Sequence, residues 1–169
     1  MSMSELVIRQ VTPADLDRCA EIEAACYGPE GATRERIATR IEVYPQGFLV
    51  ASLDGQIVGF INSGSTSKDD LSDEAFKDMA GHEPQGRNIV VFSLAVHPRF
   101  QKRGFAAGLM RRFIEWARQL GKAQILLMCR AGLVPYYQRF GFLYRGESRS
   151  THGGLHWHEM ALPLIPAED

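Results

Sequence analysis

Residues 89–120 constrain the fold of this 169-residue chain more than any other stretch. Residues 89–96 (IVVFSLAV) are nearly all apolar, as expected of a strand that is buried on both faces. After a polar turn, apolar side chains recur at helical spacing, at Leu109, Met110, Phe113, Ile114, Ala117 and Leu120. Gly121 is suited to end that helix. A buried strand that leads into an amphipathic helix indicates an α/β fold.

The rest of the chain predicts further strands and helices. Thr12 and Pro13 mark a helix start, because threonine caps helices and proline suits their first position. Asp54-Gly55 between two β-rich runs predicts an antiparallel hairpin. We expect strands at residues 6–11, 47–53, 56–63, 124–129, 142–146 and 155–162, and helical segments after Pro13, before Pro45, near residues 75–79 and at residues 135–140. The prediction is one domain over residues 1–169, an α/β (α+β) fold whose central mixed, twisted sheet is flanked by helices on both faces.

Composition excludes several classes of protein. Lys and Arg number 19 against 20 Asp and Glu, so the chain lacks the basic excess of a general nucleic-acid binder. No stretch approaches the roughly 18 apolar residues of a membrane span, and no secretory leader is visible. Three cysteines without a C-x-x-C pair fit neither a disulfide scaffold nor a zinc site. We therefore expect a soluble, cytoplasmic protein with no nucleic-acid or membrane partner; oligomeric state is not readable.

The turn between the buried strand and its helix has the composition of a phosphate site. A helix start presents unpaired backbone N–H groups, and Gly104 and Ala106 are small enough to let a pyrophosphate approach them. Between residues 99 and 118, six basic residues stand against one acidic residue. The nucleotide P-loop and the dinucleotide-binding pattern are both absent. The alternative is that Gly104 eases a tight turn and the arginines form a solvated helix face.

This segment resembles the GNAT N-acetyltransferase superfamily. Its central motif is Gln or Arg, two residues, Gly, one residue, then Gly or Ala, and Gln101, Gly104 and Ala106 match it. The resemblance extends to the preceding LAVHPRF and to Tyr137 with the following FGF at residues 140–142, and so covers most of the chain. Within the superfamily, LLMCRAGLVPYYQRFGF is similar to the corresponding stretch of the serotonin (arylalkylamine) N-acetyltransferases.

The resemblance implies acetyl-CoA as cosubstrate and a reaction that needs no metal. The pantetheine arm would run along the strand like an added strand, and the pyrophosphate would meet amides of the turn and helix start. The implied cofactor-binding residues are Leu94, Ala95, Val96, Gln101, Lys102, Arg103, Gly104, Phe105, Ala106 and Ala107. The amine would attack the thioester directly in a ternary complex, with Tyr137 as the general acid that protonates the CoA thiolate. Packing is the alternative role for Tyr137, and Tyr136 is an available neighbour.

One departure from the resemblance concerns proton removal. Serotonin N-acetyltransferases carry two histidines on the strand, and the corresponding positions here are Val90 and Phe92. An alkylamine is mostly protonated at neutral pH, so Glu83, His82, Ser93 or a water chain must take its proton. The expected acceptor is a small alkyl- or arylalkylamine. Peptide N-termini or lysine side chains are alternative acceptors, and a non-catalytic acyl-CoA sensor is the alternative function.

Three further features allow weaker interpretations. The insertion at residues 68–83 carries six acidic and two basic residues, which would either attract a cationic amine or simply solubilise the surface. His156 and His158 are expected on one face of a strand, but without further ligands we expect no metal site. Cys129 is expected to be a small buried hydrophobe and not a nucleophile.

Overall fold

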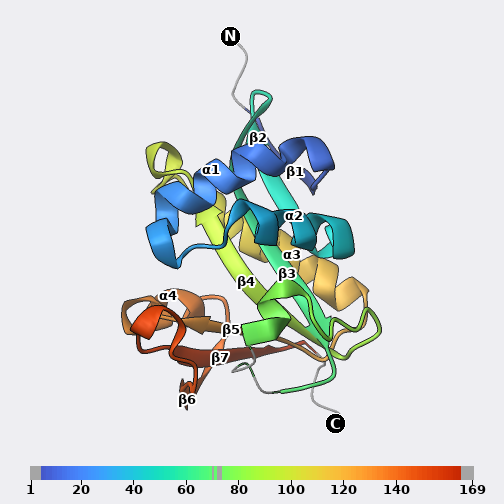
Figure 1. The fold of residues 1–169 in the computed structure, drawn as a ribbon, viewed down its shortest axis with the longest axis vertical. Coiled ribbons are helices and arrows are strands. Elements are labelled where there is room, and N and C mark those ends of the chain that lie inside the picture. The colour runs from blue at the N-terminus through green and yellow to red at the C-terminus, as the bar shows by residue number, and fades with distance from the viewer. Residues whose placement is uncertain (1–4, 70, 72–73, 165–169) are drawn as a thin grey trace. The chain divides into compact units, whose positions relative to one another are not determined.

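The computed structural model describes residues 5–69, 71 and 74–164. Seven strands form one mixed sheet in the order β1-β2-β3-β4-β5-β7-β6 (Figure 1). The chain divides into two compact units: unit 1 comprises Met1–Ser63 and Ser93–Phe113, and unit 2 comprises Gly64–Phe92 and Ile114–Asp169. Strands β3 (Gln56–Thr66) and β4 (Asn88–Val96) and helix α3 (Phe105–Gln119) contribute residues to both units. The expected α/β fold with a mixed sheet is confirmed.

Unit 1 begins with the elements that the sequence indicates. They are β1 (Leu6–Gln10), a 3-10 turn (Pro13–Asp15), α1 (Leu16–Tyr27), α2 (Arg34–Val43) and β2 (Leu49–Leu53), followed by β3. Thr12 and Asp15 form a capping box that starts the turn into α1, as the Thr12-Pro13 signal predicts. β2 and β3 pair antiparallel around Asp54-Gly55, and both of these residues have positive φ. The hairpin prediction is therefore confirmed.

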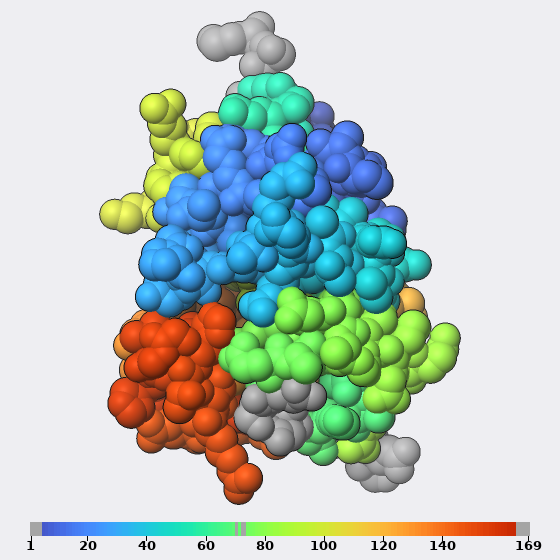
Figure 2. Space-filling view, in the orientation of Figure 1, coloured from blue at the N-terminus to red at the C-terminus, as the bar shows by residue number. Residues whose placement is uncertain are grey.

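The two faces of the unit 1 sheet carry different helices. Val50 of β2 belongs to a buried cluster with Ile22 of α1 and Ile37 of α2. The next residue along β2 points to the opposite face and pairs with Ile8 of β1. A Cβ on Gly108 of α3 would lie 3.9 Å from the Ile8 side chain. Helices α1 and α2 thus cover one face, where Figure 2 shows their side chains as a continuous blue layer, and α3 lies against the other.

Unit 2 is built on the C-terminal strands. β5 (Gln124–Cys129), α4 (Val134–Gln138), β6 (Leu143–Glu147) and β7 (His158–Pro163) follow α3, and β7 pairs antiparallel with both β5 and β6. β4 pairs parallel with β5 over Asn88–Val90. A buried ammonium holds the polar insertion: Lys122 Nζ donates to Ser65 Oγ at 3.0 Å, Pro84 O at 2.9 Å and Gly86 O at 2.6 Å.

The structure corrects two boundaries. The last strand begins at His158 and not at residue 155, because a 3-10 turn over His152–Gly154 precedes it. Leu155 N donates to His152 O at 3.2 Å in this turn, Gly153 and Gly154 have positive φ, and Trp157 Nε1 donates to the same His152 oxygen. The short helix expected near residues 75–79 is a 3-10 segment, Glu74–Asp78. β3 ends at Thr66 and not at residue 63, because the strand continues after the composition turns polar at Ser63.

Candidate active site

The pairing of β4 with β5 ends at Val90. The C-terminal part of β4, which lies in unit 1, therefore has one edge that is not paired with β5. The backbone N–H of His97 donates to Val58 O of β3 at 2.8 Å. Because backbone groups alternate between the two edges of a strand, those of Leu94 and Val96 face away from β3. The predicted binding strand therefore presents backbone hydrogen-bonding groups along this edge.

Side chains of unit 1 already contact the carbonyls of this edge. Tyr27 Oη donates to Leu94 O at 2.5 Å, and Cys26 Sγ donates to Val96 O at 3.1 Å. Gln101 Nε2 donates to the same Val96 oxygen at 2.9 Å. The end of α1 is thereby fixed to β4. Gln101, a predicted cofactor-binding residue, holds the turn onto the strand in this structure.

The turn before α3 has the backbone geometry of an anion site. Lys102 and Gly104 have positive φ, +65° and +83°, and such alternation in a turn curls successive N–H groups toward one side. Gly108 N donates to Gly104 O at 3.0 Å, so the N–H groups of residues 105–107 precede the first bond of the helix. The guanidinium of Arg103 lies 5.5 Å from the Phe100 ring centroid. The exposed turn combines these donors with two cations.

Glu23 of α1 is a buried carboxylate that the sequence analysis missed. It is 2% exposed, and its Oε2 accepts from Ala32 N at 2.7 Å and from Ser93 Oγ of β4 at 3.1 Å. Its Oε1 is buried and has no hydrogen-bond partner among the described residues. Burial raises the pKa of this carboxyl, against the two hydrogen bonds and the charge of Arg40. Glu23 lies at helical spacing between Cys19 and Cys26, on the apolar face of α1, and an acidic residue at such a position indicates a buried carboxylate.

Tyr137, the proposed general acid, lies on α4 in unit 2. It is half-buried, with its ring centroid 5.8 Å from that of Phe142 and 5.3 Å from that of Tyr136. Burial raises the pKa of its phenol, with smaller contributions from Cys129 and Tyr136. Tyr137 therefore keeps its proton throughout the neutral range.

The two positions that replace histidines lie in an apolar cluster of unit 2. Val90 packs with Leu71, Leu126 and Ala161, and Phe92 packs against the same cluster. The Phe92 ring also lies edge-on to that of Phe76, at a centroid distance of 5.3 Å. Apolar side chains cannot carry a proton, so Val90 and Phe92 provide no equivalent of the proton path that histidines at these positions would form.

The other expected proton acceptors have defined partners. His82 Nδ1 accepts from Ser65 N at 3.0 Å, while burial and the charge of Lys122 lower its pKa. Glu83 Oε1 accepts from Ser67 Oγ at 3.0 Å on the surface. The hydroxyl of Ser93 donates to Glu23. Of these hydrogen bonds, the one from Ser93 leads to a buried carboxylate.

The acidic insertion forms local contacts within unit 2. Asp69 accepts from Arg87 Nη2 at 3.2 Å and from Asn88 Nδ2 at 2.9 Å. Glu74 pairs with Lys77 at 3.1 Å and with His152 Nδ1 at 3.2 Å. Asp70 and Asp73 lie outside the described residues. These pairings favour the interpretation that the described acidic side chains stabilise the insertion.

The histidines and the cysteine of the C-terminal part have structural surroundings. His156 precedes β7, so the expected shared strand face with His158 is wrong. Its Nδ1 lies 2.8 Å from Glu147 Oε1, and His158 Nδ1 lies 2.8 Å from Tyr144 Oη. Cys129 is buried, and burial raises the pKa of its thiol to about 11, which keeps it in the less nucleophilic thiol form.

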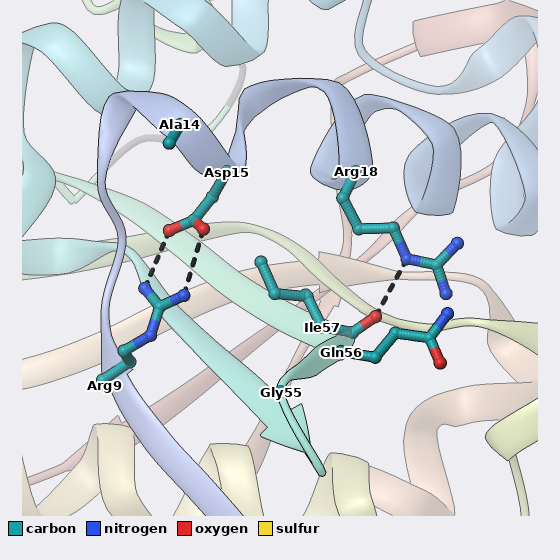
Figure 3. A pocket seen from close by; sticks show the side chains of 7 residues that line it. All are labelled: Arg9, Ala14, Asp15, Arg18, Gly55, Gln56 and Ile57. Atoms are coloured by element: carbon teal, nitrogen blue, oxygen red, sulfur yellow. Dashed lines mark hydrogen bonds and ion pairs between the residues drawn. The ribbon is translucent and has the colours of Figure 1, made fainter.

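A pocket on unit 1 lies apart from the predicted residues. It is lined by Arg9, Ala14, Asp15, Arg18, Gly55, Gln56 and Ile57 (Figure 3). Arg9 forms two bonds with the Asp15 carboxylate, at 2.8 and 3.0 Å, and Arg18 Nε donates to Ile57 O at 2.9 Å. These polar groups join the walls of the pocket to one another, and we assign it no ligand.

Comparison with known proteins finds relatives in sequence and in structure. A serotonin N-acetyltransferase of Macaca mulatta is 30% identical over 161 residues, which are 92% of this chain and 78% of the relative. A probable hydrolase of Bacillus subtilis, YhcX, is 25% identical over 146 residues; the match spans 80% of this chain but only 28% of that protein. The crystal structure of the loading GNATL domain of CurA from Lyngbya majuscula superposes with a TM-score of 0.83 at 17% identity, covering 95% of this chain and 98% of that domain.

Family membership rests on the match to a family profile that covers more than half of the chain. Across the part of the chain that the structure describes, no helix has the length and apolar character needed to span a bilayer. The sequence profile of the Acetyltransferase (GNAT) family matches residues 16–142, which include β4, the turn before α3 and Tyr137. The chain belongs to the GNAT acetyltransferase family, whose members use acetyl-CoA.

Proposed function

We propose that residues 1–169 act as one N-acetyltransferase domain that transfers an acetyl group from acetyl-CoA to a primary amine, with a small alkyl- or arylalkylamine as acceptor. The observation that carries the proposal is the combination, within unit 1, of the β4 edge beyond Val90 and the N–H-rich turn before α3. The similarity to a serotonin N-acetyltransferase supports the class of acceptor.

The two parts of this combination suit two parts of the cosubstrate. The edge formed by Leu94 and Val96 offers backbone groups to the amides of the pantetheine arm, as an added strand does. The N–H groups at the start of α3, with the cations Lys102 and Arg103, suit the pyrophosphate, because unpaired helix N–H groups and the helix dipole favour anions. Gly104 presents no side chain there, and the space around the position of a Cβ is open, with no atom within 4 Å.

In the proposed reaction the neutral amine attacks the thioester carbonyl, the C–S bond breaks, and the thiolate takes a proton from Tyr137. The nitrogen loses one proton as the amide forms, and a proton from solvent restores the Tyr137 phenol. The raised pKa of Tyr137 keeps that proton on the phenol until a thiolate forms. Backbone N–H groups of β4 stabilise the developing oxyanion. The step needs no metal ion.

The test of this mechanism is Tyr137→Phe, which removes one oxygen and keeps the ring packed against Phe142. General acid catalysis contributes about 10²–10⁴-fold, so the single-turnover rate should fall within that range while CoA affinity stays unchanged. Tyr136→Phe is the matched control on the same helix and should change the rate little. Wild-type single-turnover rates in Tyr137→Phe would remove this residue from the mechanism.

A non-catalytic acyl-CoA sensor is the second candidate, and the apolar surroundings of Val90 and Phe92 favour it. A thiol-release assay separates the two. An enzyme releases CoA only when an amine is added, whereas a sensor binds acetyl-CoA without turnover. A panel of arylalkylamines, polyamines, aminoglycosides and peptides also distinguishes small amines from peptide N-termini and lysine side chains as acceptors.

A further inference from the structure

Glu23 occupies an unusual position for a charged side chain. Its carboxylate is enclosed by α1, by the segment that contains Gly31 and Ala32, and by Ser93 of β4. One oxygen, Oε2, receives both hydrogen bonds, and the buried Oε1 has no partner among the described residues. A carboxylate that served only to tie these segments together would gain from using both oxygens. The hydrogen bonds of this carboxylate therefore do not account for both of its oxygens, and Oε2, which accepts from Ser93 Oγ, is the atom that a proton from Ser93 would reach.

The link to Ser93 connects this carboxylate with the proposed reaction centre. Ser93 immediately precedes Leu94, whose backbone faces the edge proposed for the pantetheine arm. Its hydroxyl donates to Glu23 Oε2 at 3.1 Å, which leaves the lone pairs of Oγ to accept from another donor. An ammonium group that hydrogen-bonds to Ser93 Oγ would thus be one hydroxyl away from a base.

We propose that Glu23 accepts the proton of the amine substrate through the hydroxyl of Ser93. The proposal rests on the proposed acetyltransferase function. The substrate ammonium gives its proton to Ser93 Oγ while the Ser93 hydroxyl proton moves to the carboxylate. The products are a neutral amine, an unchanged serine and a protonated Glu23, so charge and protons balance. The amine lone pair is then free to attack.

The charges around Glu23 fit this role. Arg40 of α2 favours the carboxylate, whereas the neighbouring thiols of Cys19 and Cys26 on α1 stay protonated because burial raises their pKa. Burial also raises the pKa of Glu23 above that of an exposed glutamate, which brings it nearer the operating pH of a general base. Burial and the charge of Lys122, by contrast, lower the pKa of His82, which makes it a weaker base than an exposed histidine.

The experiment compares Glu23→Gln, Ser93→Ala and wild type in the full chain, with two amines of different basicity. The amide that Glu23→Gln introduces keeps an acceptor oxygen for Ala32 N and Ser93 Oγ, so the fold should be preserved. With an alkylamine that is protonated at the assay pH, kcat/KM should fall by about 10²-fold or more in both variants, and the acidic limb of the pH profile due to Glu23 should disappear in Glu23→Gln. With a weakly basic amine that is already neutral, the loss should shrink to a few-fold.

The control is Glu21→Gln, on the exposed side of the same helix, where Glu21 pairs with Arg18. It should leave the rates and the pH profile unchanged. CoA affinity, measured by calorimetry, should be the same in all variants. An equal loss with both amines, or a wild-type pH profile in Glu23→Gln, would overturn the inference and leave Glu23 as a structural tie.

The design separates this inference from the proposed function. If wild type binds no acetyl-CoA or turns over no amine, the proposed function fails, and the inference fails with it. If wild type is active and Glu23→Gln does not fold, Ser93→Ala decides alone, because it interrupts the relay but leaves the carboxylate in place. Wild-type rates in Ser93→Ala with the protonated amine would then refute the relay.

Discussion

Replacing Gly104 by alanine should destabilise the free protein through its backbone alone. Gly104 has φ +83°, and a Cβ built on it meets nothing within 4 Å, so no steric contact adds to the effect. The left-handed conformation costs a residue with a side chain about 1–2 kcal/mol. For a chain of this size, 1 kcal/mol shifts Tm by roughly 2–4 °C, so Gly104→Ala should lower Tm by about 2–8 °C.

Gly132→Ala is the matched control, because Gly132 also has open space around its Cβ but no positive φ. Its stability should stay the same or rise by about 0.4–1 kcal/mol, since alanine reduces the entropy of the unfolded chain. Both variants should be compared with wild type by calorimetry and by urea unfolding without ligand. Equal shifts in the two variants would refute the reasoning, because φ is the property that separates the two sites.

Two further predictions concern the anion site and the start of α1. Ala106→Glu should slightly stabilise the free protein, since a carboxylate suits the first turn of α3. A carboxylate about 5 Å from a bound pyrophosphate should repel it by roughly 1–3 kcal/mol per charge, so the CoA Kd should rise at least about 5-fold. Unchanged CoA affinity in calorimetry would argue against the anion site. The Arg9 hydrogen bond holds the pKa of Asp15 below its usual 3.8, so its contribution is present above that pH and is lost as the pH falls through the lower folded pKa. Asp15→Asn should therefore cost on the order of 1–3 kcal/mol in urea unfolding at pH 7, and the difference from wild type should shrink below pH 4; a difference independent of pH would contradict the ion pair.

Local signals in the sequence predicted much of the fold. The run at residues 124–129, apolar after Gln124, coincides with β5, because a mostly buried strand shows as a continuous apolar run. Thr12 and Pro13 specify a helix start through their own backbone preferences, and Asp54-Gly55 specifies a hairpin in the same way. Such signals need no knowledge of distant parts of the chain.

The features that the sequence did not reveal depend on hydrogen bonds between particular side chains and backbone groups. Glu23 is buried because Ser93 and Ala32, 70 and 9 residues away, supply hydrogen bonds to its carboxylate. Similarly, the role of Gln101 in this structure depends on where Val96 O points. The start of β7 at His158 follows a 3-10 turn whose His152 oxygen also accepts a hydrogen bond from Trp157 Nε1. In each case the decisive partner is chosen by tertiary structure, which residue type and spacing do not encode.

The bond from the Tyr27 phenol to Leu94 O makes any strand-like ligand on this edge a competitor of the protein's own helix. A carbonyl oxygen has two lone pairs, so an amide that takes the lone pair used by the phenol replaces a hydrogen bond and does not add one. Binding at that lone pair and release of the Tyr27 phenol are then coupled, and the ligand's apparent affinity is its intrinsic affinity multiplied by the fraction of molecules in which the phenol is not bound to Leu94 O. Tyr27→Phe should therefore tighten binding of the pantetheine arm while leaving the α3 turn unaffected.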